Sequence, residues 1–308
     1  MEKQCCSHLM MVRPVCFGFN EQTAESNAFM HEAEPNENPQ EDALKHFDEF
    51  VAKLRKAKVN ITVIEDTPEP CTPDSIFPNN WVSFHADGRV FLYPMEARNR
   101  RAERSTNLLN LLESNFNIES IHHLEQHENN KHYLEGTGSL VLDRSKKVAY
   151  ACLSSRTHES VIEDWASHFP DYEIVTFDAL DEAGVSIYHT NVMMNIGADF
   201  SLICAESIRD ITQRNQVLNR LKESGKEPLE ISLAQMNEFA GNMLQVENID
   251  GERILVMSER AYQSLNKSQI AFLEERTFIL RAELGLIETL GGGSARCMLA
   301  EIHLPLKA

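Results

Sequence analysis

Residues 291–299 have the sequence Gly-Gly-Gly-Ser-Ala-Arg-Cys-Met-Leu, in which a loop of small residues runs directly into a hydrophobic segment. Four earlier stretches share this pattern of small or amide residues followed by an apolar run: Pro-Asn-Asn-Trp-Val at 78–82, Glu-Gly-Thr-Gly-Ser-Leu at 135–140, His-Thr-Asn-Val-Met-Met at 189–194 and Ala-Gly-Asn-Met-Leu at 240–244. Successive stretches are separated by roughly 50 to 58 residues, which is the size of one structural module in a repeat protein.

A second apolar segment follows four of the five stretches, at 90–93, 148–152, 201–204 and 254–257. We therefore expect each module to contain a pair of strands and a helix. Five such modules around one axis predict a closed, propeller-like α/β domain. The alternative is an ordinary α/β protein, because strands flanked by glycine and asparagine recur in many such folds.

Hydrophobic periodicity predicts helices at 41–57, 101–115, 159–168, 207–224 and 266–276. Runs rich in apolar residues predict strands at 59–64, 81–85, 90–93, 139–142, 148–152, 192–196, 201–204, 243–246, 254–257 and 295–302. No linker rich in proline, glycine or serine divides the chain. We therefore expect a single domain over residues 1–308.

The composition, with 42 % hydrophobic and 25 % charged residues, is typical of a soluble globular protein. The formal net charge of −18 would repel phosphate backbones and anionic lipids, which argues against nucleic-acid and membrane-surface partners. No apolar run approaches the roughly 20 residues that span a bilayer. Residues 1–6 lack the basic and apolar pattern of a secretory signal, so a cytoplasmic location is expected.

Seven cysteines are scattered along the chain, at positions 5, 6, 16, 71, 152, 204 and 297. They form no Cys-x-x-Cys pair, and no histidine lies at zinc-ligand spacing from them. Neither a zinc site nor a disulfide framework is expected.

Three chemically complementary residues occupy the same point of their modules, where the loop meets the strand: Glu135, His189 and Cys297. In a radial array these points converge on the axis. A thiolate at Cys297 would be a nucleophile, His189 could exchange protons near neutral pH, and Glu135 could orient the imidazole. The alternative is structural, since a cysteine after a glycine-rich turn is often simply buried and a histidine is often only a satisfied polar residue.

Several motifs extend this pattern over nearly the whole chain: Met-Val-Arg-Pro-Val-Cys-Phe-Gly-Phe-Asn-Glu at 11–21, Pro-Asp-Ser-Ile-Phe-Pro-Asn-Asn-Trp at 73–81, Leu-Glu-Gly at 134–136, Leu-Ser-Ser-Arg at 153–156, His-Thr-Asn at 189–191 and Gly-Ser-Ala-Arg-Cys-Met at 293–298. Their order and spacing resemble the amidinotransferase and arginine-deiminase superfamily, and within it the citrulline-utilisation hydrolases of the CtlX type. This resemblance implies a fivefold pseudosymmetric α/β propeller and a catalytic centre of Cys297, His189 and Glu135.

The resemblance also implies a set of substrate-binding residues. By similarity to dimethylarginine hydrolases, Asp74 would hold the substrate backbone, and Arg156 and Arg100 would bind its α-carboxylate. The match at Arg100 needs a one-residue insertion, so Arg98 or Arg101 are alternatives, and a solvated helix start is the structural reading of this cluster. The same matching segments add Phe77, Asn80 and Asn191 to the substrate-binding set.

Arginine deiminases place two carboxylates against the guanidinium, at positions that here are Asn80 and Asn191. A buried cation without counter-charges is costly, whereas a neutral ureido group can be matched by amides. The substitution favours citrulline over arginine, although Glu135 remains a possible counter-charge.

The expected reaction is attack of the Cys297 thiolate on the ureido or guanidino carbon, with His189 protonating the leaving nitrogen and then activating water. Citrulline would give ornithine, carbon dioxide and ammonia, without a metal or organic cofactor. The alternatives are an arginine deiminase, a methylarginine hydrolase, an amidinotransferase and a non-catalytic amino-acid-binding protein. The partner in each case is a small amino acid, and a homo-oligomer is compatible with the sequence.

Overall fold

The computed structural model describes residues 2–32, 38–104 and 112–307. Its strands confirm the mixed α/β class and form five separate three-stranded sheets. Four sheets follow one another along the chain: β3 (Val82–Phe84), β4 (Arg89–Leu92) and β5 (Ser120–His123); β6 (Val141–Asp143), β7 (Val148–Cys152) and β8 (Glu173–Phe177); β9 (Met194–Ile196), β10 (Phe200–Ile203) and β11 (Glu227–Glu230); β12 (Leu244–Glu247), β13 (Arg253–Ser258) and β14 (Phe278–Ala282). The fifth contains β15 (Ala300–Glu301), β1 (His8–Arg13) and β2 (Asn60–Glu65).

All five sheets have the same connectivity. The middle strand pairs antiparallel with the first and parallel with the third. In the fifth sheet the first strand comes from the far end of the chain, because β15 pairs with β1 through Leu9 and Glu301 and through Met10 and Ala300. None of the sheets in the described ranges closes into a barrel, so the closed propeller stays a prediction.

The sequence predicted two strands and a helix in each module, but each sheet contains a third, parallel strand. The predicted number of strands per module is therefore wrong. The third strand β2 was predicted at 59–64, but the other four were missed because several of them are short and half-exposed. β11 has the sequence Glu-Pro-Leu-Glu, and β5 alternates half-buried with exposed residues. Such segments contain too few apolar residues to be recognised without their partner strand.

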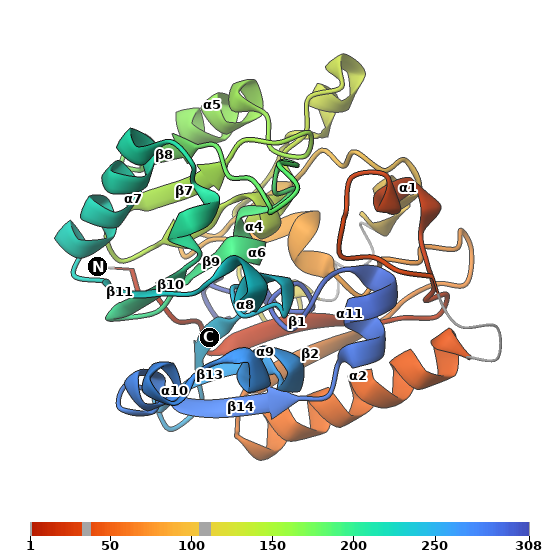
Figure 1. Cartoon of the computed structure of the whole chain (residues 1–308). Helices are drawn as coiled ribbons and strands as arrows, with labels where there is room; N and C mark the ends of the chain where they lie inside the picture. Colours follow the sequence, from red (N-terminus) through yellow and green to blue (C-terminus); the bar gives the residue numbers. More distant parts are fainter. Residues whose placement is uncertain (1, 33–37, 105–111, 308) are drawn as a thin grey trace.

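The longest helix, α2 (Pro39–Lys56), begins two residues before the predicted start, because Asn38 caps it and Pro39 occupies its first turn. Its apolar face packs against β2 and β14 (Figure 1) and buries Ala43, Phe47, Phe50, Val51 and Leu54. Burial of a large apolar side chain contributes about 1.5–3 kcal/mol, so this face anchors the helix.

The other predicted helices are α5 (Glu159–His168), α7 (Ile211–Glu223) and α10 (Lys267–Glu274). α7 begins later than predicted, because the Asp210 carboxylate accepts from the backbone N–H groups of Thr212 and Gln213. A helix was predicted at 101–115, but residues 105–111 lie outside the described residues. On either side of them, the 3₁₀ helix η2 (Asn99–Glu103) overlaps the start of this range, and Leu112 is helical. The structure also contains four short helices: α1 (Glu21–Ala24), α8 (Leu233–Asn237), α9 (Glu259–Ser264) and α11 (Gly285–Gly291).

Each recurring loop forms a helical turn before its strand. These turns are η1 (Pro78–Asn80), α4 (Gly136–Ser139), α6 (Thr190–Met193) and the turns at 238–241 and 295–298. The strands predicted from 139, 192 and 295 therefore start later than expected. α4 contacts both η1 and α6, and α4 and α6 lie together near the middle of the molecule (Figure 1).

Cys16 and Cys71 form a disulfide, and the other five cysteines are free and buried. The bond was not expected from the scattered cysteines. It joins the segment after β1 to the segment after β2, and both segments contribute residues to the site below. Among the described residues, no helix is both long enough and apolar enough to cross a membrane.

Candidate active site

Two of the helical turns begin at a predicted catalytic residue. Glu135 precedes α4 and His189 precedes α6, and each occupies the N-cap position of its turn. Cys297 lies in the turn at 295–298, ahead of β15. The three side chains are 0–3 % exposed, so this centre lies away from bulk solvent.

His189 and Glu135 form a direct pair, with 2.9 Å between His189 Nε2 and Glu135 Oε2. The other oxygen of Glu135 accepts the backbone N–H of Glu96 at 3.0 Å. The guanidinium of Arg156 lies 3.6 Å from Glu135 Oε2, and that of Arg100 lies 3.9 Å from it. Both oxygens of Glu135 are therefore occupied by protein groups.

Burial alone would raise the pKa of Glu135, but Arg156 and the hydrogen bond with His189 lower it to about 2. Burial lowers the pKa of His189 to about 4, although Glu135 opposes this shift. At neutral pH the carboxylate is ionised and the imidazole is neutral. His189 then donates Nε2–H to Glu135 and leaves Nδ1 free to accept a proton.

Two amides contact the sulfur of Cys297. Asn242 Nδ2 donates to Sγ at 3.3 Å, and Asn191 Nδ2 lies 3.6 Å from it. Asn242 is itself fixed, because Nδ2 also reaches the Asn191 carbonyl and Oδ1 accepts the backbone N–H of Arg296, each at 3.0 Å. Both amides therefore offer N–H donors to the sulfur.

The glycine run before Cys297 acts mainly through close packing. Of the three glycines only Gly292 has a positive φ, 62°, at the end of α11. A Cβ on Gly293 would lie 2.9 Å from the Phe77 ring and 3.3 Å from Cys297 Cβ. The Tyr188 hydroxyl donates to the Gly292 carbonyl at 2.6 Å and ties this loop to the turn that carries His189.

Seven of the nine predicted site residues line one small pocket: Asp74, Phe77, Asn80, Arg100, Arg156, His189 and Cys297. Glu135 lies behind His189, and Asn191 contacts Cys297. The pocket has a volume of about 10 Å³, close to that of one water molecule. Side chains must therefore separate before an arginine-sized molecule can enter.

The candidate carboxylate-binding arginines differ in their surroundings. Arg100 is buried against Glu103, with Nε and Nη2 at 2.8 and 2.9 Å from the two carboxylate oxygens. Burial raises the pKa of Glu103 to about 7, although Arg100 opposes the shift. Arg98 is exposed, and Arg101 lies 3.2 Å from Glu128, so neither alternative lines this pocket.

Arg156 holds a different position at the edge of the pocket. Its Nη2 donates to the Thr23 carbonyl at 2.7 Å and to the Ser26 hydroxyl at 2.8 Å. Its guanidinium lies over the Tyr188 ring, 4.9 Å from the centroid. The segment with α1 therefore covers one edge of Arg156 and leaves its Nη1 beside Glu135.

Asp74 is a buried carboxylate with one free oxygen. Oδ2 accepts from Asn20 Nδ2 at 2.8 Å, whereas Oδ1 has no hydrogen-bond partner among the described residues. Burial raises the pKa of Asp74, against the opposing charge of Arg100. A cationic group such as an α-ammonium would complement this free oxygen.

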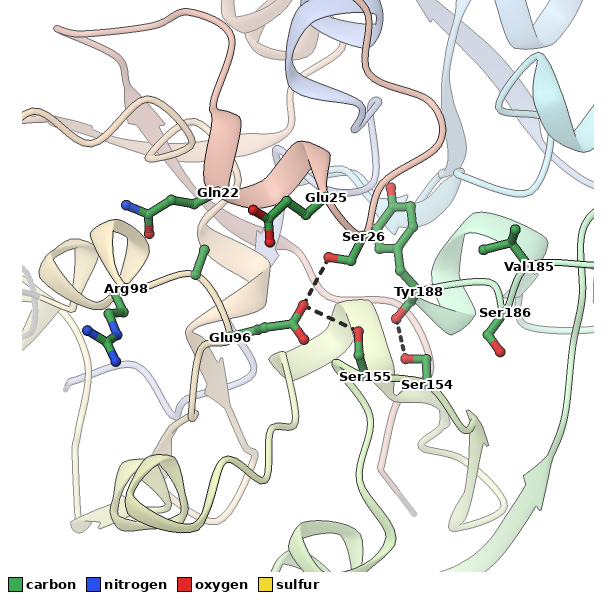
Figure 2. Close-up of a pocket in the computed structure, with 11 residues that line it drawn as sticks. Gln22, Glu25, Ser26, Glu96, Arg98, Ser154, Ser155, Val185, Ser186 and Tyr188 are labelled. Atoms are coloured by element: carbon green, nitrogen blue, oxygen red, sulfur yellow. Dashed lines mark hydrogen bonds between the residues drawn. The ribbon is translucent and has the colours of Figure 1, made fainter.

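A wider cavity of about 710 Å³ shares Tyr188 with this small pocket, and its lining residue Ser26 accepts a hydrogen bond from Arg156. Figure 2 shows Glu96 between Ser26 and Ser155, whose hydroxyls lie 2.9 and 3.3 Å from its Oε2. Because the Glu96 backbone N–H binds Glu135, this residue connects the cavity to the predicted catalytic carboxylate.

The described residues contain one group of three possible metal ligands, namely Cys6, Glu301 and His303. Glu301 lies 2.7 Å from Arg296 and 3.9 Å from Arg144. These two positive charges oppose a bound cation. The predicted catalytic residues do not form such a group.

Sequence reasoning missed Asn242, Glu103, Tyr188 and Asn20. The signal for Asn242 was present, because it lies in the fourth recurring loop, the only one for which no chemical role was assigned. Tyr188 directly precedes His189, but an aromatic residue next to a polar one carries no pattern of its own.

Similarity to known proteins indicates the family of this chain. Residues 13–304 match the family model described as N,N dimethylarginine dimethylhydrolase, eukaryotic. No curated protein matches the sequence.

Solved structures share the fold at low identity. The substrate-bound N-terminal domain of ArgZ, an arginine dihydrolase from the ornithine-ammonia cycle in cyanobacteria, has a TM-score of 0.75 and 16 % identity over 97 % of this chain and 98 % of that one. The chain covers 41 % of full-length ArgZ, with a TM-score of 0.76 and 16 % identity. A dimethylarginine dimethylaminohydrolase adduct with S-methyl-L-thiocitrulline has a TM-score of 0.67 and 13 % identity over 98 % of this chain and 100 % of that one. Through its match to the family model over most of its length, the chain belongs to the N,N-dimethylarginine dimethylhydrolase family, within the pentein superfamily of guanidino-modifying enzymes.

Proposed function

We propose that the protein is a cysteine-dependent hydrolase of the C–N bond at the ureido or guanidino carbon of an arginine-like amino acid, with citrulline as the preferred substrate. One observation carries this proposal. The groups that contact the Cys297 sulfur are the amides of Asn191 and Asn242, at 3.6 and 3.3 Å, whereas the Glu135 carboxylate is already matched by protein donors.

A guanidinium transferred into this pocket would lose its hydration and gain little charge compensation. Glu135 has Arg156 and Arg100 as counter-charges, so it offers little to a second cation. A ureido group is neutral and carries both a carbonyl acceptor and N–H donors, which amides can match. This argument supports citrulline over arginine and over methylarginines.

The reaction follows from the states of the catalytic groups. The Cys297 sulfur bonds to the ureido carbon, and the bond from that carbon to the side-chain nitrogen breaks. His189, having taken the proton of the Cys297 thiol at Nδ1, passes it to the leaving nitrogen of ornithine. Water, activated by His189, then hydrolyses the thiocarbamoyl group to carbamate, which decomposes to carbon dioxide and ammonia. The sum is citrulline plus water to ornithine, carbon dioxide and ammonia.

The other site residues complete the proposal. We assign the free oxygen of Asp74 to the substrate α-ammonium and the guanidinium of Arg156 to its α-carboxylate. Phe77, packed on Gly293, would form an apolar wall of the pocket. We also infer that residues 1–308 act as one domain in which the five sheets surround a common axis. The shared connectivity and the contacts of α4 with η1 and α6 support that arrangement.

The experiment is a comparison of kcat/KM for citrulline, arginine and asymmetric dimethylarginine, with products identified by mass spectrometry. We expect citrulline to be preferred and ornithine to be the amino-acid product. If the enzyme turns over arginine or dimethylarginine better than citrulline, the proposed substrate is wrong. Release of citrulline from arginine would identify a deiminase, and release of ornithine from arginine would identify an arginine dihydrolase.

A further inference from the structure

Ser139 is fully buried at the end of α4, and its hydroxyl joins two segments that carry predicted site residues. The oxygen accepts the backbone N–H of Glu135 at 2.9 Å and the hydroxyl of Thr157 at 2.8 Å. The hydroxyl donates its own proton to the backbone carbonyl of Arg156 at 2.9 Å. A serine hydroxyl has one donor and two lone pairs, so these three contacts use its full capacity and leave none for a substrate.

Apart from this hydroxyl, the described contacts between the backbones of Glu135 and Arg156 are weak. The Glu135 N–H also faces the Arg156 carbonyl directly, but across 3.3 Å. Next to them, Leu134 and Thr157 form an isolated β-bridge that is not part of a longer ladder. Removal of the hydroxyl would therefore leave a buried N–H with one long contact, and the two segments could shift relative to each other.

The Arg156 backbone is itself fixed to the segment of His189. Its N–H donates to Ser154 Oγ at 3.2 Å, and the Ser154 hydroxyl donates to the Tyr188 carbonyl at 2.8 Å. Tyr188 directly precedes His189 in the chain. The N–H side of Arg156 is thus tied to the segment of the predicted catalytic histidine, while Ser139 binds its carbonyl side.

Ser139 also contacts the residue that follows His189. The Thr190 hydroxyl donates to the Ser139 carbonyl at 2.6 Å and accepts the backbone N–H of Cys152 at 2.8 Å. Ser139 and Thr190 are both fully buried, so bulk water does not compete for these bonds. Ser139 therefore connects the Glu135 backbone to the chain on both sides of His189, through the Arg156 segment on one side and directly on the other.

We propose that Ser139 is a positioning residue that keeps the Glu135 carboxylate in register with the His189 imidazole. This inference rests on the proposed function, in which Glu135 orients the imidazole, and it adds the residue that sets their relative position. The 2.9 Å bond between His189 Nε2 and Glu135 leaves Nδ1 free for the proton of the Cys297 thiol. A small displacement of the carboxylate would let the ring turn and would slow the proton transfer.

The test uses Ser139→Ala, with Ser201→Ala as the matched control. Ser201 is also fully buried, but its Oγ has no hydrogen-bond partner among the described residues. The first measurement is the proton resonance of His189 Nε2–H in the enzyme without substrate, identified by its absence in His189→Asn. A hydrogen bond to a carboxylate moves such a resonance downfield. The second measurement is kcat and KM for citrulline, and circular dichroism verifies that each variant is folded.

In Ser139→Ala we expect the Nε2–H resonance to move upfield, because the carboxylate no longer keeps its position. We expect kcat to fall roughly tenfold, since misplacement of a proton-transfer group slows the chemical step. KM should change far less, because Arg156 keeps its contacts with Ser154 and Ser26. Ser201→Ala should match the parent in both measurements.

An unchanged resonance or an unchanged kcat in Ser139→Ala would overturn the inference. A rise in KM at constant kcat would overturn it as well, because Ser139 would then act on Arg156 and not on Glu135. If Ser139→Ala does not fold, Ser139→Cys decides, since a thiol resembles the hydroxyl in shape but is only a weak donor and acceptor. The same two changes should then appear at smaller size, and their absence contradicts the inference.

Failure of the proposed function gives a different result. A parent enzyme that prefers another substrate contradicts only the proposed function, because the resonance is measured without substrate. That substrate then replaces citrulline in the measurement of kcat and KM, and the inference about Ser139 is decided by the same outcomes.

Discussion

The side-chain amide of Asn242 donates to the sulfur of Cys297 across 3.3 Å, and its oxygen is held by the backbone N–H of Arg296. The amide therefore sits in one orientation and stabilises a negative sulfur. We predict that Asn242→Ala slows alkylation of Cys297 by iodoacetamide at pH 7 roughly tenfold, as for the loss of one hydrogen bond to a charged group. Asn248→Ala, at an amide that binds Ala57 and Glu252, is the control. If Cys297 is alkylated at the same rate in both variants, Asn242 does not stabilise its sulfur.

Replacing Cys297 with alanine should abolish turnover and leave the fold intact. The side chain is small, and the turn that carries it is held by backbone hydrogen bonds from Cys297 and Met298 to Ser294. Activity assays with circular dichroism check both parts. Cys204→Ala, at another buried free thiol, should retain full activity. Turnover by Cys297→Ala would end its assignment as nucleophile.

Arg156→Ala should mainly weaken substrate binding, because a charge-assisted contact contributes about 1.5–3 kcal/mol. The expected result is a large rise in KM for citrulline with a smaller change in kcat. With citrullinamide, which has no α-carboxylate, the KM of the variant should differ only slightly from that of the parent. A parent enzyme that accepts the amide as well as the free acid would show that Arg156 does not bind a carboxylate.

Acid should weaken the fold through His189. Burial lowers its pKa to about 4 from the 6.5 of an unfolded chain. The unfolded state therefore takes up the proton first as the pH falls, and the free energy of unfolding should drop between about pH 6.5 and 4, by about 3 kcal/mol for a shift of this size. Urea unfolding at pH 7 and pH 4 measures the drop, which should be smaller in His189→Asn. An identical drop in both proteins would contradict the prediction.

The double substitution Asn80→Asp and Asn191→Asp should move preference from citrulline towards arginine. Each carboxylate would compensate a guanidinium and would repel the oxygen of a ureido group. The ratio of kcat/KM for the two substrates measures the change, since it reports differential binding in the transition state. A double variant that keeps the parent's ratio would show that neither side chain faces the reacting group.

Part of this architecture could be predicted because its pattern is local. The small-residue loops identify all five turns, and the apolar runs give β7 and the periodic pattern gives α5 to the residue. Of the third strands only β2 was predicted, from the apolar run at 59–64, and the other four could not be predicted in this way. A strand such as β11 is stabilised by parallel pairing with β10, and that partner lies beyond an intervening helix in the sequence.

The site residues also divide into those that a local sequence pattern predicts and those that depend on contacts with other parts of the chain. Glu135, His189 and Cys297 could be selected because their residue types are reactive and occur at equivalent points. Asn242 lies in the fourth recurring loop but was given no role, because its contact with Cys297 joins residues distant in sequence. Glu103 could not be selected, because its role arises from burial. The carboxylate of Glu103 is matched by Arg100 three residues before it, which in sequence resembles an exposed helical ion pair.

Pairing of Leu9 with Glu301 has a kinetic consequence for this enzyme. The strand that follows Cys297 joins its sheet only when two segments at opposite ends of the chain meet. Closing so long a loop carries a large entropic cost, and contacts between distant segments slow folding. The other four sheets can assemble from consecutive segments. During refolding, protection of the Cys297 thiol should therefore be acquired late, after most of the secondary structure has formed.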